Sequence, residues 1–280
     1  MFWIWFFCIL AGLLFLGAVV LFFVGRRLRF MPYTVTLPKL PASFDGFRIA
    51  VISDLHDRRF GSANGILARK VLQASPDLVV MAGDMHEPPH DPQPFYDLIR
   101  SLSARAPVTY TEGNHDLRNM SSPRYAEHLD RIAQNGAEVL LDSFFPILRN
   151  GQILMLYGQS WRSIREGRQP TFDPSVCTVA VCHDPLQFDR LQTLPDLMIS
   201  GHVHGGILRL PFIGAVFAPG NGAPLYKRAS LRYFFPKYSH GLYRKEENIL
   251  ALTQGLGFSM LPVRFIPPEV MILTLKSGKK

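Results

Sequence analysis

The chain has 280 residues, of which 48% are hydrophobic, and its formal net charge is +8 at pH 7. This length allows one large domain or two small ones, and the hydrophobic content is sufficient for a sizeable core. The three cysteines exclude a disulfide framework and favour a reducing compartment, because Cys177 and Cys182 fall in one extended apolar run that holds them apart.

The N-terminus predicts a membrane anchor. Residues 2–24 contain no charge and read FWIWFFCILAGLLFLGAVVLFFV, a run that is long enough to cross a bilayer as a helix. A cleaved signal peptide carries its basic residues before the apolar core, whereas here Arg26, Arg27 and Arg29 follow it. We therefore predict an uncleaved transmembrane anchor over residues 1–25. The positive-inside tendency places the arginines, and the domain behind them, on the cytoplasmic side of the inner membrane.

The helix and strand patterns after the anchor predict one α/β domain over residues 47–280. Residues 26–46 carry three prolines and little periodicity, so we expect a basic juxtamembrane linker there. Strands over 47–53 and 77–83, with a helix over 64–74 between them, are typical of the opening of a parallel sheet. Helices over 94–102 and 122–136, a strand over 107–113 and a hairpin turning at Asn150-Gly151 follow. Four apolar strands complete the set, with the sequences VCTVAV, PDLMIS, ILALTQG and VMILTL.

Residue types that bind metals follow five of these strands. The motifs are Asp54-Leu55-His56, Gly83-Asp84, Gly113-Asn114-His115-Asp116, Cys182-His183-Asp184 and Gly201-His202-Val203-His204. Because the carboxyl ends of strands in an open α/β sheet border one crevice, we expect the five loops to converge. Carboxylate, amide and imidazole groups without a thiolate suit divalent manganese, iron, zinc or cobalt. Seven such ligands suit two ions better than one.

The five motifs, in this order, resemble those of the calcineurin-like metallophosphoesterases from about Phe47 to the C-terminus. The resemblance implies an αββα sandwich of two mixed sheets flanked by helices. It implies a shared metal ligand, Asp84, between two ions whose other ligands are Asp54, His56 and His204 for the first and Asn114, His183 and His202 for the second. It also implies an activated water as nucleophile and His115 as general acid, with Asp116 or another carboxylate orienting the His115 ring.

Other polar residues near these motifs have weaker assignments. Many relatives carry Gly-Asp-x-x-Asp in the second motif, whereas this chain has Glu87 in place of the last aspartate, which leaves the orientation of groups near His115 open. Arg58 and Arg59 are candidate contacts of a substrate phosphate, with an ordinary exposed basic pair as the alternative. The remaining polar residues nearby are expected to be solvated: Asp57, His86, His90 and His128.

Three stretches of the last third resemble a membrane-associated branch of the family: GHVHGGILRLPFIGAVF, HGLY and QGLGFSMLPVRFIPPEVMIL. That branch includes phosphodiesterases and a UDP-2,3-diacylglucosamine pyrophosphatase of lipid A synthesis, which implies an anionic, lipid-linked substrate. Within residues 206–238, basic and aromatic side chains alternate, and this suits either the lipid headgroup region or a core-packing insert. The candidate lipid contacts are Arg228, Arg232, Phe234 and Phe235.

The sequence therefore predicts a membrane-anchored two-metal enzyme that hydrolyses a phosphodiester or pyrophosphate bond. A general phosphodiesterase with a small-molecule substrate stays open as an alternative. The charge of +8 also suits a nuclease, but the anchor and the lack of a nucleic-acid-binding motif disfavour nucleic acid as a partner. A catalytically silent membrane scaffold would have lost a metal ligand, and the sequence retains all of them.

Overall fold

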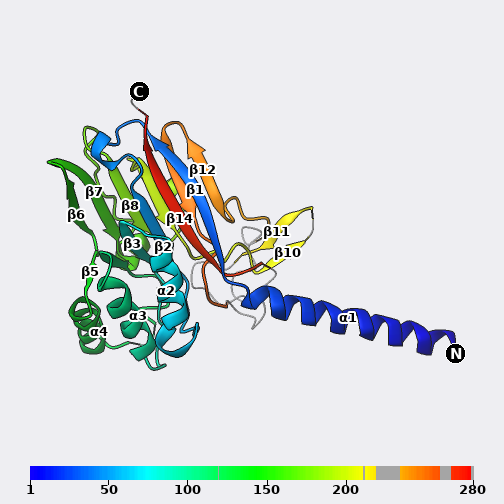
Figure 1. The fold of residues 1–280 in the computed structure, drawn as a ribbon. Coiled ribbons are helices and arrows are strands. Elements are labelled where there is room, and N and C mark those ends of the chain that lie inside the picture. Colours follow the sequence, from blue (N-terminus) through cyan, green and yellow to red (C-terminus); the bar gives the residue numbers. More distant parts are fainter. Residues whose placement is uncertain (119, 211, 219–233, 259–265, 279–280) are drawn as a thin grey trace.

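A single long helix extends away from a two-sheet domain in the computed structural model (Figure 1). The structure describes residues 1–118, 120–210, 212–218, 234–258 and 266–278. Helix α1 spans Phe2–Arg26, and its apolar side chains are exposed along most of its length. Its 25 residues extend about 37 Å at a rise of ~1.5 Å per residue, which exceeds the ~30 Å hydrocarbon core of a bilayer. By length and composition, α1 is therefore able to cross a membrane.

The first sheet has six strands in the order β1-β14-β2-β3-β4-β5. Strand β14 is antiparallel to β2, and all other neighbours in this sheet are parallel. The bounds are Arg29–Leu37 for β1, Arg48–Ile52 for β2, Leu78–Ala82 for β3, Val108–Thr111 for β4, Ala137–Val139 for β5 and Glu269–Ser277 for β14.

The second sheet also has six strands, in the order β12-β13-β9-β8-β7-β6, with antiparallel pairs at both edges. The bounds are Ser143–Arg149 for β6, Gln152–Gln159 for β7, Thr178–Cys182 for β8, Leu197–Ser200 for β9, Gly241–Lys245 for β12 and Asn248–Leu252 for β13. The predicted hairpin at Asn150-Gly151 joins β6 and β7. A separate two-stranded hairpin consists of β10, Leu208–Leu210, and β11, Gly214–Phe217.

Apolar packing on both faces of the sheets produces the layers. In β2, Ile49 and Val51 face the second sheet, whereas Ala50 and Ile52 pack against the helices outside, as the period of two in a strand requires. The helices are α2 (Gly65–Gln73), α3 (Gln93–Ser103) and α4 (Ser122–Gln134) beside the first sheet, and α5 (Trp161–Glu166) and α6 (Gln187–Arg190) beside the second, with short 3-10 turns at Ala42–Phe44 and Ser62–Asn64. The predicted αββα sandwich of two mixed sheets is confirmed.

The segment expected to be a linker contains a strand of the first sheet. Strand β1 pairs with β14 in parallel over nine residues, and its Val35 and Leu37 side chains are buried in the core between the sheets. Pro32 interrupts the sequence pattern of a strand, but β1 lies at the edge of the sheet, where a missing N–H donor is tolerated. The folded domain therefore begins almost directly after α1.

Replacing Leu37 tests whether β1 belongs to the cooperative domain. Leu37→Ala removes a fully buried side chain, so the free energy of unfolding should fall by about 2–5 kcal/mol. Thr36→Ala, at an exposed position of the same strand, should change it by no more than about 0.5 kcal/mol. Chemical denaturation of the full chain in detergent measures both. If both substitutions change the free energy of unfolding by equally small amounts, β1 does not belong to the cooperative domain.

Candidate metal centre

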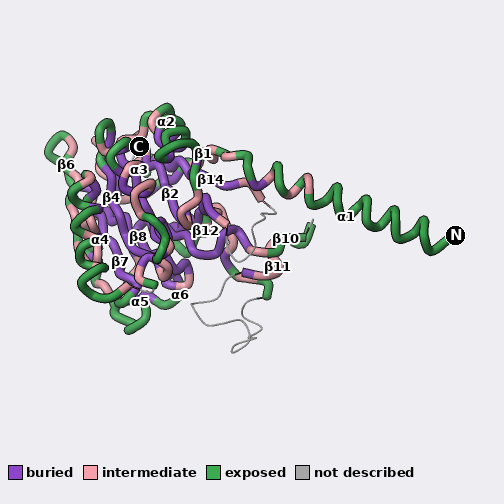
Figure 2. Tube along the Cα trace, turned by 90° about the horizontal axis from the view of Figure 1, so that it is seen from below, coloured by how far each residue is buried: buried purple, intermediate pink, exposed green. Residues whose placement is uncertain are grey.

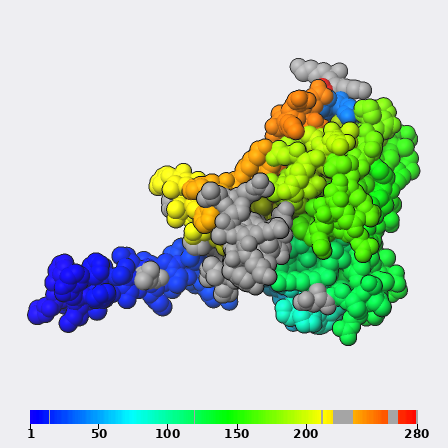
Figure 3. All heavy atoms as spheres, turned by 180° about the vertical axis from the view of Figure 1, so that it is seen from behind, coloured from blue at the N-terminus to red at the C-terminus, as the bar shows by residue number. Residues whose placement is uncertain are grey.

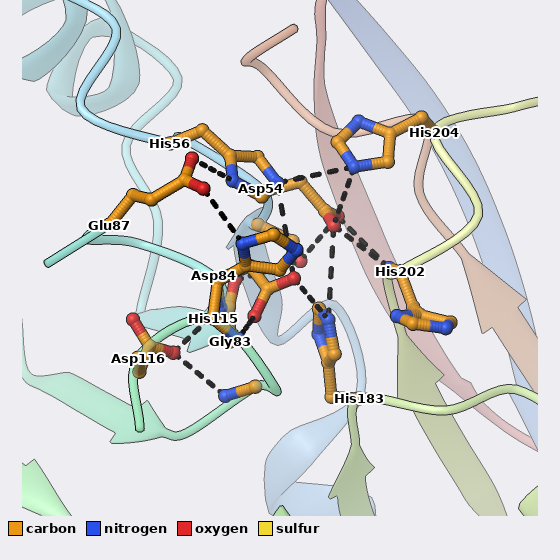
Figure 4. Close-up of polar contacts among 12 residues, drawn as sticks. Asp54, His56, Gly83, Asp84, Glu87, His115, Asp116, His183, His202 and His204 are labelled. Carbon is orange, nitrogen blue, oxygen red and sulfur yellow. Dashed lines mark hydrogen bonds and ion pairs between the residues drawn. The ribbon is translucent and has the colours of Figure 1, made fainter. Parts of the chain in front are cut away.

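The loops after five strands meet at one end of the sandwich, where their imidazole and carboxylate groups face one another (Figure 4). Three groups of side chains bring potential ligand atoms within 4.8 Å of one another: Asp54, His56 and His204; His56, Asp84 and His115; and Asp84, His183 and His202. The first group matches the set implied for the first ion. The third group contains Asp84 and two of the residues implied for the second ion.

Asp84 lies at the centre of this arrangement. Its Oδ2 atom is 3.1 Å from His183 Nε2 and 3.9 Å from His56 Nε2, and its Oδ1 atom accepts the backbone N–H of His115 at 2.7 Å. Burial by itself would raise the pKa of Asp84, but the adjacent His183, together with His56 and His115, holds that pKa well below its ordinary value. Asp84 is therefore a carboxylate at neutral pH that faces both halves of the centre.

Asp54 is the second buried carboxylate. Ser53 Oγ donates a hydrogen bond to Asp54 Oδ2 at 2.8 Å, and the backbone N–H of His202 donates to Oδ1 at 3.0 Å. The same Oδ1 atom is 3.5 Å from His204 Nε2 and 3.9 Å from His183 Nε2. These contacts hold the carboxylate beside His204 and within 3.9 Å of His183.

The donor atoms fit divalent cations. His56 Nε2 and His204 Nε2 point toward each other at 3.2 Å, with their rings stacked at 5.0 Å between centroids, so a cation between them would be bound by both imidazoles. Within the part of the chain that the structure describes, His202 Nε2 and Asn114 Oδ1 are buried and have no hydrogen-bond partner. Buried polar atoms without a partner are costly, and metal coordination satisfies them.

The backbone of the centre is held in unusual conformations. Five of the seven predicted ligands have φ between 45° and 75°, in the left-handed region: Asp54, His56, Asp84, His202 and His204. Such residues cost free energy and concentrate at functional sites. Gly201 permits the close approach, because a Cβ atom there would lie 2.1 Å from Ser53 Oγ and 2.5 Å from Asp54 Oδ2. Gly201, directly before His202, thus permits the tight packing around Asp54.

His115 lies at the edge of the centre. Its side chain is 24% exposed, unlike the buried ligands around it, and its Nδ1 atom is 3.1 Å from Glu87 Oε1. The other Glu87 oxygen is 3.4 Å from His56 Nδ1. Hydrogen bonds from His115 and His56 hold the pKa of Glu87 well below its ordinary value. Glu87 is therefore ionised at neutral pH, and its two oxygens contact the rings of both His115 and His56.

Of the two alternatives for the carboxylate beside His115, Asp116 or another one, the geometry favours another one. Its buried carboxylate accepts four backbone N–H groups, at 2.7 Å from Asp84 and Gly113 and at 3.0 Å from Met85 and His86. These bonds hold the loop after β3 against the loop after β4. Asp116 is thus committed to backbone donors, and Glu87 is the carboxylate that contacts His115.

Trp161 is a residue of the site that the motifs did not reveal. Its ring lies 5.5 Å from the His202 ring and 6.0 Å from the His183 ring, and its backbone N–H donates to Glu112 Oε1 at 2.8 Å. It thus covers one side of the two imidazoles. The sequence could have indicated Trp161 by its position shortly after β7, which ends at Gln159. Because β7 runs parallel to β8, the two strands end at the same edge of the sheet.

The two arginines after His56 have separate roles. Arg58 donates hydrogen bonds to the backbone carbonyl of Leu256 at 2.8 Å and to that of Gly25 in α1. Its guanidinium also lies over the rings of Phe60 and Phe258, at 4.8 Å and 4.5 Å from their centroids. Arg58 thus joins α1 to the loop after β2 instead of facing the open site. Arg59 is exposed and stays a candidate phosphate contact.

Two of the histidines expected to be solvated are buried. His86 Nδ1 contacts Asp57 Oδ1 at 2.7 Å, and His128 Nδ1 contacts the Tyr96 hydroxyl at 2.6 Å because α4 packs this face against α3. That prediction was wrong for His86 and His128, whereas His90 is exposed as expected. Burial also lowers the pKa of His128 to about 4, so it is neutral at pH 7.

The candidate lipid contacts are only partly described. Arg228 and Arg232 lie outside the described residues. Phe234 and Phe235 are 46% and 67% exposed, and the Phe234 ring packs edge to face against Phe217 in β11. These two aromatic side chains are therefore available to a ligand next to the β10–β11 hairpin.

Replacing His115 separates a general acid from a metal ligand. His115→Ala should keep its metal content yet lose about 10²–10⁴-fold in rate, the range expected for general acid catalysis. An activated leaving group such as p-nitrophenolate should partly restore the rate, because it needs no proton. Metal analysis and single-turnover kinetics check this, with the exposed His90→Ala as the matched control. Loss of metal without rescue would make His115 a ligand.

Comparison with known proteins agrees with this geometry. Residues 47–206 match the model of the calcineurin-like phosphoesterase family. The chain is 26% identical over 258 residues to the uncharacterized metallophosphoesterase YkuE of Bacillus subtilis, covering 88% of this chain and 84% of that protein. It is 28% identical over 239 residues to phosphodiesterase YaeI of Escherichia coli, covering 82% of each chain.

A further relative is the UDP-2,3-diacylglucosamine pyrophosphatase LpxG of Chlamydia trachomatis, at 25% identity over 291 residues, covering 85% of this chain and 86% of that protein. The family match spans more than half of the chain and includes every loop of the metal centre. The protein therefore belongs to the calcineurin-like phosphoesterase family and is a metal-dependent hydrolase.

Proposed function

We propose that this protein is a membrane-anchored two-metal phosphoesterase that hydrolyses a phosphodiester or pyrophosphate bond in an anionic, lipid-linked substrate such as UDP-2,3-diacylglucosamine. The observation that carries the proposal is the convergence of five imidazoles on the two buried carboxylates, Asp54 and Asp84, in a chain that also carries a long apolar helix. Manganese is the proposed native metal because the donors are oxygen and imidazole without thiolate.

Each residue of the metal centre would have a separate role in hydrolysis. One ion would be bound by Asp54, His56 and His204. The other ion would be bound by Asn114, His183 and His202, and Asp84 would bind both ions. The ions would activate water and neutralise the phosphoryl oxygens. His115, oriented by Glu87 at 3.1 Å, would give its proton to the leaving oxygen. Trp161 limits access of water to the rings of His183 and His202 from one side.

The lipid-linked class of substrate rests on the surroundings of the centre. Helix α1 would hold the enzyme in the membrane, and Arg58 connects the end of that helix to the loop that carries His56. The exposed side chains of Phe234 and Phe235 suit contact with acyl chains. Arg228 and Arg232 are residue types that suit contact with a lipid headgroup. The exposed Arg26, Arg27 and Arg29 at the end of α1 favour a catalytic domain in the cytoplasm. The similarity to LpxG supports the same class.

A soluble phosphodiester is the second candidate substrate. The similarity to YaeI, which is named a phosphodiesterase without a stated substrate, favours it. In that case the metal centre and His115 act in the same way, and the aromatic side chains near β11 contribute nothing to turnover.

A substrate panel separates the two candidates. The full chain in detergent with Mn²⁺ should hydrolyse bis-p-nitrophenyl phosphate and UDP-2,3-diacylglucosamine, and it should leave single-stranded DNA intact. The variant with Phe234→Ser, Phe235→Ser, Arg228→Gln and Arg232→Gln should lose about tenfold or more on the diacylated substrate only, since apolar contacts are removed. Leu148→Ser, at an exposed apolar position far from the centre, is the control. Equal loss on both substrates, or on neither, would contradict the lipid-linked class.

A further inference from the structure

The hairpin β10–β11 presents large apolar side chains to solvent. It belongs to neither main sheet, and Leu208, Leu210, Phe212 and Ile213 are 38%, 42%, 109% and 61% exposed. Phe212 and Ile213, between the two strands, are the most exposed of the four. Soluble proteins rarely expose such a contiguous apolar patch, and where they do it marks a protein or membrane contact.

The hairpin lies on the side of the domain from which α1 emerges. Figures 1 and 2 show β10 and β11 next to the C-terminal end of α1, and Figure 3 shows the same two segments together from behind. The β6–β7 hairpin lies at the opposite side of the molecule (Figure 1). The hairpin and α1 thus lie on the same side of the domain.

The β10–β11 hairpin and α1 both contact loops that contain predicted metal ligands. Strand β10 begins four residues after His204, and Arg209 Nη1 donates a hydrogen bond of 2.6 Å to the Gly205 carbonyl at the base of the hairpin. Helix α1 is held through Gly25 by Arg58, two residues after His56. Hairpin and helix are therefore fixed to two loops that carry ligands of the same predicted ion.

Charge favours a lipid bilayer as the occupant of this surface. Arg26, Arg27 and Arg29 are exposed where α1 ends, and Arg209 lies in the hairpin itself. Basic residues on the same side of the domain as an exposed apolar hairpin suit the headgroup region of an anionic leaflet, in which the apolar side chains enter the acyl boundary.

We propose that the tip of the β10–β11 hairpin, Phe212 and Ile213, inserts into the same leaflet from which α1 emerges, so that the metal centre opens at the bilayer surface. This inference rests on the membrane anchoring in the proposed function. The hairpin acts as a second, interfacial contact that prevents the domain from rotating about the end of α1. A lipid-linked phosphate in that leaflet then reaches the ions without leaving the membrane.

Fluorescence quenching locates the tip directly. In a full chain with Cys8→Ala, Phe212→Cys carries an NBD label, since Cys177 and Cys182 are buried. Leu148→Cys in the β6–β7 hairpin, where Leu148 is 69% exposed, is the matched control. Both proteins are reconstituted into vesicles of phosphatidylethanolamine and phosphatidylglycerol that contain lipids spin-labelled near the headgroup. The probe at 212 should be quenched and blue-shifted, and the probe at 148 should be neither.

The outcomes separate this inference from the function on which it rests. Resistance of the protein to carbonate extraction reports anchoring by α1, and hydrolysis of bis-p-nitrophenyl phosphate reports the metal centre. With both retained, an unquenched probe at 212 overturns the hairpin inference alone. Quenching at both positions also overturns it, because the contact would then not be specific to the hairpin. If the labelled probe is unquenched and the unlabelled Phe212→Cys protein forms a disulfide-linked dimer under oxidation, the surface is assigned to a dimer instead.

Discussion

The carboxylate of Asp84 is the group on which the rest of the centre depends. It faces His183 at 3.1 Å and His56 at 3.9 Å, and it accepts the backbone N–H of His115. A buried carboxylate among imidazoles is stable only if cations or hydrogen bonds compensate its charge. The four backbone bonds to Asp116 hold the loops around it in place. The position of Asp84 is thus fixed at the ends of β3 and β4, and its charge is stabilised by His56 and His183, which follow β2 and β8.

The rigid strands of the sandwich hold the strained backbone of the loops that contain Asp54 and Asp84 in place. Asp54 and Asp84 follow fully buried strands, and both have φ near 50°. The apolar core between the sheets compensates that cost and fixes the distance between loops from the two sheets. Arg58 connects the same centre to α1. The loop between His56 and Phe60 therefore links the candidate membrane helix to the metal centre.

Much of the fold and the ligand set followed from local patterns. Continuous apolar runs predicted the buried strands, and polar residues directly after them predicted which side chains converge. Strand β1 escaped prediction because Pro32 and a partner, β14, some 240 residues away leave no local signal. The burial of His128 depends on how α4 packs on α3, and the pairing of Glu87 with His115 depends on two loops meeting. Such tertiary contacts are invisible to sequence spacing.

Metal content of the Asp84 variant tests the central claim most directly. Full-length protein purified from cells supplemented with Mn²⁺ should contain two equivalents of metal by elemental analysis, as a centre with a shared carboxylate requires. Asp84→Ala should lose at least one equivalent and hydrolyse no bis-p-nitrophenyl phosphate, while its circular dichroism spectrum stays that of the native chain. A folded Asp84→Ala protein that retains both equivalents, or full activity, would contradict the two-metal account.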